Sequence, residues 1–309
     1  MQTTSKTIRW LLEADSAIRW QVLRDLCDEP APVYESERAL VTQQGWGARL
    51  LAKQDEDGNW GRGIYSPKWK STTYTLLTLR HLGLPPEHPQ ALRGCEKFFS
   101  HGLEQDGGIN LWKSHRHSET CINGMFLALL AYFGYPDERI HSVFEFLLNE
   151  QMPDGGWNCE RIKGATHASF HTTISVLEGL DEYRAHYPEN MPAVKAARAK
   201  AHEFLLQHHL YKSHRTGEIF DTKMTLMHFP PRWRYDFIRA LDYFQGIDAP
   251  KDERMDDAIQ LLRAKQNPDG TWPLNAPWPG LVYFHMEETG KPSHWNTLRA
   301  LRVLKWWHS

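Results

Sequence analysis

The sequence has no long apolar run, and its cysteines form no pair motif. No stretch of about 18 apolar residues occurs, so we expect no transmembrane segment. The opening MQTTSKTIRWLLEADS lacks the apolar core of a secretion signal, which favours a cytoplasmic protein. The cysteines are scattered without a CxxC pair, which indicates free thiols in a reducing compartment. They are Cys27, Cys95, Cys121 and Cys159.

Charge of one sign is also scarce. The formal net charge of −2 argues against nucleic acid as a partner, because phosphate binding needs a basic surface. No alternation of apolar and polar residues is long enough to predict a sheet. In contrast, the chain is rich in Trp (13) and His (17), and its 309 residues can bury a large core.

An internal repeat is the strongest signal in the sequence. Four segments share the order Gln, acidic turn, Gly, Trp, and their starts lie 51, 46 and 115 residues apart. The last interval is about two periods, and a degenerate copy near Gln207, with Trp233 as its Trp, fits inside it. The four segments are QDEDGNWGRG from Gln54, QDGGINLW from Gln105, QMPDGGWNCE from Gln151 and QNPDGTWPLN from Gln266.

Each turn lies between two stretches with helical patterns. An amphipathic stretch such as IHSVFEFLLNEQ precedes it, and a more apolar one such as TCINGMFLALLAYFG follows it. Five such units and a shorter N-terminal pair make six. We therefore predict an all-α fold, an (α/α)6 toroid of six helix pairs with an inner ring of helices, formed by residues 1–309 as a single domain. An open superhelix of helix pairs is the structural alternative.

The repeated Q…DG.W turns followed by apolar helices resemble the QW repeats of squalene–hopene and oxidosqualene cyclases and of protein prenyltransferase β-subunits. The resemblance covers nearly the whole chain. It implies that the N-terminal ends of the inner helices supply the functional groups around a central cavity. The residues at these places are Trp69 and Lys70; His117, Glu119 and Cys121; His167 and His171; Arg232, Trp233 and Asp236; and His294 and Trp295.

The resemblance to cyclases implies an acid that protonates the substrate, but the DxDD motif of the squalene cyclases is missing. The comparable stretch, WKSTTYTLL, carries Lys70 and no carboxylate. A single-barrel cyclase would need a different acid, Glu119 or Asp236, with His117 and His171 as further acid or base groups. A partly apolar pocket would suit Glu119 as a general acid, whereas a salt bridge to Lys113 or Arg116 is its structural alternative.

The resemblance to prenyltransferases implies zinc bound by Asp, Cys and His. The stretch GATHASFHTT is similar to the family motif, with Ala165 at the Asp position and His167 at the Cys position, and His294 matches the later His. Imidazole and thiolate both bind zinc, so we expect His167, His294 and Cys121 as candidate ligands of Zn2+. Packing of these groups inside the ring is the alternative.

Two further groups point to an isoprenoid. The aromatic rings of Trp69, Trp112, Phe170, Trp233, Phe284 and Trp295 would form an apolar cup that attracts a carbocation. The cations Lys70, Arg161, Arg232 and Arg234 would hold a diphosphate.

We therefore predict a terpenoid cyclase- or prenyltransferase-like enzyme, an isomerase or transferase, that binds an isoprenoid or other apolar small molecule in a central cavity. Substrate contacts would come from Trp69, Lys70, Arg232, Trp233 and Trp295. One alternative is a non-catalytic toroid that binds a ligand or a protein. Another is a zinc-dependent transferase or hydrolase that uses the same cavity. A plugged cavity would count against an enzyme.

Overall fold

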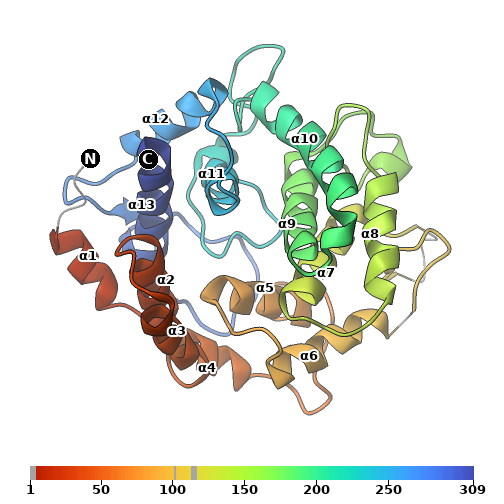
Figure 1. The fold of residues 1–309 in the computed structure, drawn as a ribbon, viewed down its shortest axis with the longest axis horizontal. Coiled ribbons are helices and arrows are strands. Elements are labelled where there is room, and N and C mark those ends of the chain that lie inside the picture. The colour runs from red at the N-terminus through yellow and green to blue at the C-terminus, as the bar shows by residue number, and fades with distance from the viewer. Residues whose placement is uncertain (1–4, 101, 113–116) are drawn as a thin grey trace.

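The chain forms a ring of helix pairs, in which each inner helix is preceded by an outer one (Figure 1). This computed structural model describes residues 5–100, 102–112 and 117–309. The predicted (α/α)6 toroid is confirmed. The inner helices are α2 (Ser16–Asp25), α5 (Thr72–Leu82), α7 (Thr120–Tyr132), α9 (Phe170–His186), α11 (Phe237–Gly246) and α13 (His294–His308).

The outer helices cover the inner ring and expose one face. Their bounds are α1 (Ser5–Leu12), α3 (Ala31–Ala39), α4 (Gly45–Leu51), α6 (Pro89–Glu96), α8 (Arg139–Asn149), α10 (Met191–Gln207) and α12 (Asp256–Ala264). Short 3-10 helices continue or join them at Leu40–Thr42, Lys97–Phe99, Arg161–Lys163, Pro188–Asn190, Thr222–Thr225 and Glu253–Met255. Within the described residues, the sheet is limited to the antiparallel pair β1 (Trp272–Pro273) and β2 (Pro292–Ser293).

The difference between inner and outer helices follows from their sequences. The inner α7 reads TCINGMFLALLAY and is buried along nearly its whole length. The outer α8 reads RIHSVFEFLLN, and its apolar residues recur at three- and four-residue spacing on one buried face. In the described part of the chain, no helix is both long and apolar enough to cross a membrane.

The repeated turns fasten each outer helix to the inner helix that follows. The indole N–H groups of Trp60, Trp157 and Trp272 each donate to the carbonyl of the Leu ten positions earlier, at 2.7–2.8 Å. The backbone N–H groups of the same three residues donate to a Thr hydroxyl of the inner helix. All three indoles are fully buried. These residues are therefore framework groups.

Two copies of the repeat differ from the prediction. In the second copy, Ile109 takes the buried Trp position, and its N–H donates to Asn123 instead of a Thr. Aligning this copy from Gln105 therefore placed it out of register with the other copies, and Trp112 is not the Trp of the turn. In the fourth unit, Trp233 packs against His171 and Arg234 instead of completing a turn.

The ring closes where α13 meets α2 (Figure 1). Arg302 of α13 donates to Gln21 and Asp25 of α2, at 3.0 and 3.3 Å. Lys305 forms an ion pair with Asp28, at 2.6 Å. Among the described residues, contacts that involve side chains therefore join the last helix pair to the first.

The inner helices α7 and α9 approach each other closely because glycines face each other. A Cβ added to Gly124 would lie 2.9 Å from backbone atoms of Ser175, and one added to Gly179 would lie 2.6 Å from the carbonyl oxygen of Gly124. A methyl group at either position would therefore force two backbones apart.

We expect Gly124→Ala to lower the free energy of unfolding by about 2 kcal/mol, since overpacking outweighs the better helix propensity of Ala. Urea denaturation measures this change. The matched control is Gly246→Ala at the end of α11, where an added Cβ has no neighbour within 4 Å. Equal stability of the two variants would contradict the close packing of α7 on α9.

Candidate functional site

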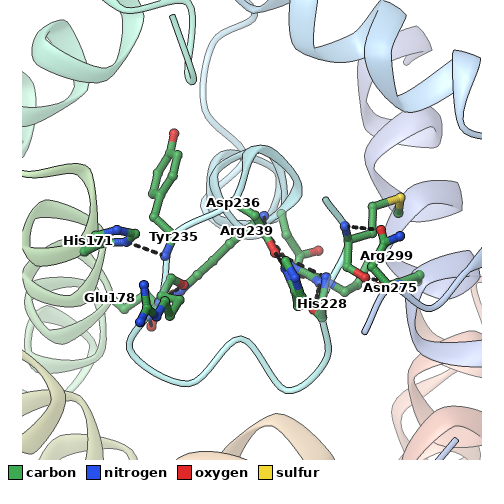
Figure 2. Close-up of polar contacts among 12 residues, drawn as sticks. His171, Glu178, His228, Tyr235, Asp236, Arg239, Asn275 and Arg299 are labelled. Atoms are coloured by element: carbon green, nitrogen blue, oxygen red, sulfur yellow. Dashed lines mark hydrogen bonds and ion pairs between the residues drawn. The ribbon is translucent and has the colours of Figure 1, made fainter. Parts of the chain in front are cut away.

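A loop crosses the inside of the ring and divides it. This central loop, residues 228–236, leads into α11 (Figure 2). Phe229 stacks on Trp295 with ring centroids 4.1 Å apart, and the carbonyl of His228 accepts from Arg299. On the opposite side, the backbone N–H of Tyr235 donates to Nδ1 of His171 at 2.8 Å. The central loop is therefore held by both α13 and α9.

Charged side chains line the space on one side of the central loop, near the C-terminal ends of the inner helices. A cavity of about 520 Å³ lies there. The Arg239 guanidinium binds both carboxylate oxygens of Glu178 at 2.8 and 2.9 Å, and Arg80 lies 3.6 Å from the same carboxylate. Arg302 binds Asp242 in the same way, at 2.6 Å. Because Arg239, Arg80 and Arg302 already have carboxylate partners, we assign them a structural role in which they link the inner helices of the ring.

The pKa values in this region reflect burial and the arginines. Burial raises the pKa of the Glu178 carboxyl, but Arg239 and Arg80 more than offset it, so the pKa falls to about 2. Burial, together with Arg80, lowers the pKa of His81 to about 3. Glu178 is therefore a carboxylate and His81 a neutral imidazole at neutral pH.

On the other side of the central loop, an aromatic box surrounds a cation. The box consists of Tyr65, Trp69 and Trp233, whose ring centroids lie 4.9, 5.9 and 5.6 Å from Nζ of Lys68. No ion pair between described residues involves Lys68. Burial lowers the pKa of its ammonium group, as does the nearby charge of Arg234. The rings therefore stabilise a positive charge without a paired carboxylate.

The box is built from segments that precede the inner helices. Tyr65 and Trp69 lie in the loop before α5, and Tyr74 in α5 packs on both, with centroids 5.2 and 4.7 Å away. The indole N–H of Trp69 donates to the carbonyls of Trp278 and Pro279 at 3.0 Å. These contacts hold the box rigid.

Glu119 lies at the edge of the aromatic box, directly before α7. Its carboxylate accepts from the indole N–H of Trp112 at 3.0 Å, and the Trp112 ring meets Tyr65 edge-on at 6.0 Å. Glu119 also lies close enough to Lys68 to raise the pKa of its ammonium group. The two partners expected for a salt bridge, Lys113 and Arg116, lie outside the described residues.

Two thiols complete this group. Cys121, the second residue of α7, is buried, and the partly exposed Cys159 follows the third turn; each of the two thiols affects the pKa of the other. Hydrogen bonds from Cys121 and Thr172 lower the pKa of Cys159 to about 7. Lys68, Glu119 and the two thiols thus gather beside the box.

Two arginines of the central loop lack a carboxylate partner among the described residues. Arg232 donates to the Thr78 hydroxyl at 3.2 Å and lies over the Trp69 ring at 5.5 Å. Burial lowers its pKa to about 10. Arg234 stacks on Trp233 and Trp278, and its buried Nε has no hydrogen-bond partner in the described part of the chain. Unpaired cations at such a depth favour an anionic ligand.

The remaining cations expected to bind diphosphate lie elsewhere. Arg161 forms a surface ion pair with Glu150. Lys70 faces a separate depression on the outer side, where its Nζ lies 5.0 Å from the Tyr283 ring. Two pockets beside Arg232 that involve Phe284 hold only about 20 and 40 Å³. Among the described residues, side chains thus fill much of the space near the inner-helix starts.

The expected zinc ligands do not converge. His167 is exposed and lies 3.4 Å from Arg215, whereas His294 stacks on Trp10 and contacts Glu287 at 3.1 Å. Cys121 is buried at the start of α7. Within the described residues, no three His, Cys, Asp or Glu side chains come close enough to hold a metal ion. Among the described residues, the three predicted ligands therefore do not form a metal site, and α13, which carries His294, lies across the ring from the neighbouring helices α7 and α9.

The other predicted catalytic groups have mainly supporting contacts. Asp236 is buried and caps α11 by accepting from the N–H of Arg239, at 2.8 Å. His171 accepts from the central loop, and burial lowers its pKa to about 4, so its imidazole is neutral. His117 is exposed. Trp295 packs on Phe229, so it supports the central loop.

Three residues of the site were missed in the sequence: Tyr65, Lys68 and Cys159. Tyr65 and Lys68 come just before Trp69 and Lys70, which were predicted from their place ahead of α5. Cys159 stands two residues after the framework Trp157. Their position is the sequence signal that could have identified these three residues, because the residues after each turn Trp run past the start of an inner helix.

Comparison with known proteins adds one sequence relative. The chain is 26% identical over 156 residues to drimenyl diphosphate synthase of Streptomyces showdoensis. The match takes in 50% of this chain and 28% of that enzyme, so the chain matches little more than a quarter of the relative's length. The chain is terpenoid cyclase-like. No family model matches it.

The solved structures are less similar to the chain in sequence than this relative. A protein from Actinoplanes is 17% identical, with 96% of this chain and 91% of that chain covered and a TM-score of 0.47. The type II terpene cyclase MstE from Scytonema is 14% identical, with 89% and 98% covered and a TM-score of 0.34. A variant of MstE in complex with geranylgeranyl dihydroxybenzoate is 13% identical, with 87% of this chain and 94% of that chain covered and a TM-score of 0.33. At these scores the likenesses do not bear on the chemistry of the site.

Proposed function

We propose that the chain is an enzyme that isomerises a linear isoprenoid through a carbocation held by Tyr65, Trp69 and Trp233. The observation that carries the proposal is the Lys68 ammonium group inside the aromatic box. Ring faces that stabilise the Lys68 ammonium group can stabilise a transient carbocation in the same way, once the carbocation takes the place of the ammonium group among the rings. The relative's name, drimenyl diphosphate synthase, supports an isoprenoid substrate.

In the proposed reaction, Glu119 is the proton donor. Its carboxyl proton adds to one carbon of a substrate double bond, whose electron pair forms the new C–H bond and leaves a cation on the other carbon. The indole N–H of Trp112 stabilises the carboxylate that remains. An internal double bond then attacks the cation and closes a ring, and loss of a proton ends the reaction. Glu119 regains its proton from water, so the product is an isomer of the substrate.

His171 and Asp236 act as positioning residues in this proposal. Both hold the central loop, which carries Trp233 and the unpaired cations Arg232 and Arg234. We propose that these two guanidinium groups bind an anionic group of the substrate, such as a diphosphate. Lys70 and Arg161 take no part, since both face other partners.

The test of the proposed function uses geranyl, farnesyl and geranylgeranyl diphosphate in D2O. We expect a ring-containing isomer that keeps its diphosphate and carries one deuterium delivered by the proton donor. Mass spectrometry after phosphatase treatment detects it. Binding of all three compounds without conversion would support the non-catalytic toroid, and absence of both binding and conversion would overturn the proposal.

Removing one loop cation should weaken binding of the anionic group. We expect Arg232→Gln to raise KM for the diphosphate substrate about ten- to hundredfold, because a charge-assisted hydrogen bond is worth about 1.5–3 kcal/mol. KM for the corresponding uncharged alcohol should stay unchanged. Arg161→Gln, which alters a surface pair, is the control. An equal rise in KM for the diphosphate and the alcohol would contradict the anionic role of Arg232.

A further inference from the structure

The amine of Lys68 takes no covalent part in the proposed isomerisation. Its Nζ lies 4.9, 5.9 and 5.6 Å from the ring centroids of Tyr65, Trp69 and Trp233. Among the described residues, this nitrogen forms no hydrogen bond and no ion pair. The side chain is partly exposed, so a small molecule can reach it. A reachable amine among aromatic rings, without a carboxylate bound to it, is a candidate nucleophile.

The backbone on both sides of this amine is fixed. The N–H of Leu281 donates to the carbonyl of Lys68 at 2.9 Å, and the N–H of Trp69 donates to the carbonyl of Leu281 at 2.7 Å. The rings are supported as well, since the indole of Trp233 meets His171 edge-on, with ring centroids 5.2 Å apart. The amine therefore keeps its place among the rings.

A second cation shares one ring of the box with Lys68. The guanidinium group of Arg234 lies over the Trp233 ring at 4.2 Å. Burial and a nearby positive charge both favour the neutral form of an amine, which is the form that attacks a carbonyl carbon. Burial lowers the pKa of the Lys68 ammonium group and Arg234 adds to this effect, against the opposite effects of Cys121 and Glu119. The neutral amine is therefore more available here than on an ordinary lysine.

We propose that Lys68 forms a Schiff base with an aldehyde that carries an apolar chain. A solvent water first accepts a proton from the ammonium group. The nitrogen lone pair attacks the carbonyl carbon, and a proton moves from nitrogen to oxygen to give a carbinolamine. The hydroxyl group then takes back the first proton and leaves as water while the C=N bond forms, and nitrogen keeps its last proton. In sum, one ammonium group and one aldehyde give one iminium ion and one water.

The aromatic box suits this product because the positive charge stays in place. The ammonium group and the iminium ion carry the same charge on the same nitrogen, so the faces of Tyr65, Trp69 and Trp233 attract both. Formation of the Schiff base therefore keeps the cation–π contacts. The same rings offer apolar surface to the chain of the aldehyde, whereas a polar aldehyde would lose its hydration there.

The experiment traps the Schiff base and does not depend on turnover. The whole chain is incubated with citronellal and sodium cyanoborohydride, which reduces an iminium ion to a stable secondary amine, and is then digested for mass spectrometry. The internal reference is Lys70, two positions further on, whose Nζ lies 5.0 Å from the Tyr283 ring outside the box. We expect labelling of Lys68 to exceed that of Lys70 about tenfold, a factor that cation–π contacts at a desolvated site can supply.

Variants test whether the box causes this preference. Trp233→Leu removes one ring face and keeps an apolar side chain, so labelling of Lys68 should fall toward that of Lys70. Tyr65→Leu should have the same effect and serves if the first variant fails to fold in urea denaturation. The matched control, Lys70→Arg, should leave labelling of Lys68 unchanged. Equal labelling of both lysines in the wild type, or unchanged labelling in the folded ring variants, would overturn the proposal.

A second aldehyde tests the substrate class. Glyoxylate is small and charged, and it should label Lys68 with less preference over Lys70 than citronellal does. A greater preference with glyoxylate would overturn the assignment of an apolar aldehyde.

The Schiff base does not rest on the proposed function, and the two can fail separately. A trapped adduct on Lys68 in a chain that converts no isoprenoid diphosphate would leave the Schiff base standing and overturn the proposed function alone. Isomerisation without a trapped adduct would do the reverse. Where both occur, the reduced adduct should abolish the isomerisation, because it occupies the aromatic box.

Discussion

Glu119→Gln should reduce the turnover of an isoprenoid substrate by about 10²- to 10⁴-fold, the contribution that a positioned general acid makes. The amide has the same shape and keeps an oxygen that accepts from Trp112, but it has no acidic proton to give. The fold and the aromatic box should therefore persist. Rates of isomer formation, measured by mass spectrometry, give the effect on kcat, and KM should change little.

The control for this variant is Glu160→Gln. Glu160 is exposed and pairs with Lys163 on the surface, so its amide should leave turnover unchanged. Unfolding by urea checks that both variants keep wild-type stability. Full turnover of Glu119→Gln would remove Glu119 from the reaction and require another proton donor.

Glu178→Gln should lower the free energy of unfolding by about 3–5 kcal/mol, the cost of breaking a buried ion pair from one side. Glu178 binds Arg239 with both carboxylate oxygens and lies 3.6 Å from Arg80. Without the negative charge of Glu178, the guanidinium groups of Arg239 and Arg80 remain buried with less compensation of their positive charges. Denaturation in urea at pH 7 measures the change. Glu138→Gln, at a side chain that is 96% exposed, should change stability by less than about 1 kcal/mol.

The same carboxylate predicts a dependence of stability on pH. The pKa of Glu178 is about 2 in the folded chain, against an ordinary value of 4.5. Because the folded value is lower, its contribution is present above about pH 4.5 and is lost as the pH falls toward 2. The stability of wild type should therefore fall more steeply than that of Glu178→Gln across this range. Parallel curves would contradict the assignment.

The fold was predictable because the helix pattern and the turn chemistry repeat. Each turn Trp donates to a carbonyl ten residues earlier, a local contact that is the same in three copies. The second copy misled the alignment because an Ile fills the buried position there and a nearby Trp stands outside it. The repeats therefore identify the framework residues, but they do not reveal the positions at which one copy departs from the pattern.

The candidate site was only partly predictable. Glu119, Trp69, Trp233 and Arg232 were found by their position before inner helices, and the structure brings them near one another or near shared partners. The partners that give them chemistry, above all Lys68, come from irregular loops without periodicity. The predicted histidines did not converge, since spacing along one helix does not fix where neighbouring helix starts lie around a ring.

The closure of α13 on α2 has a consequence for the topology of the molecule. Every other neighbouring pair of units is joined by the backbone, whereas this seam is held by contacts such as Arg302 with Asp25 and Lys305 with Asp28. A circular permutant that is joined at the seam and opened between two other units would keep the same neighbours around the ring. The order of units along the chain is thus a property of the sequence, and the toroid itself has no first or last unit.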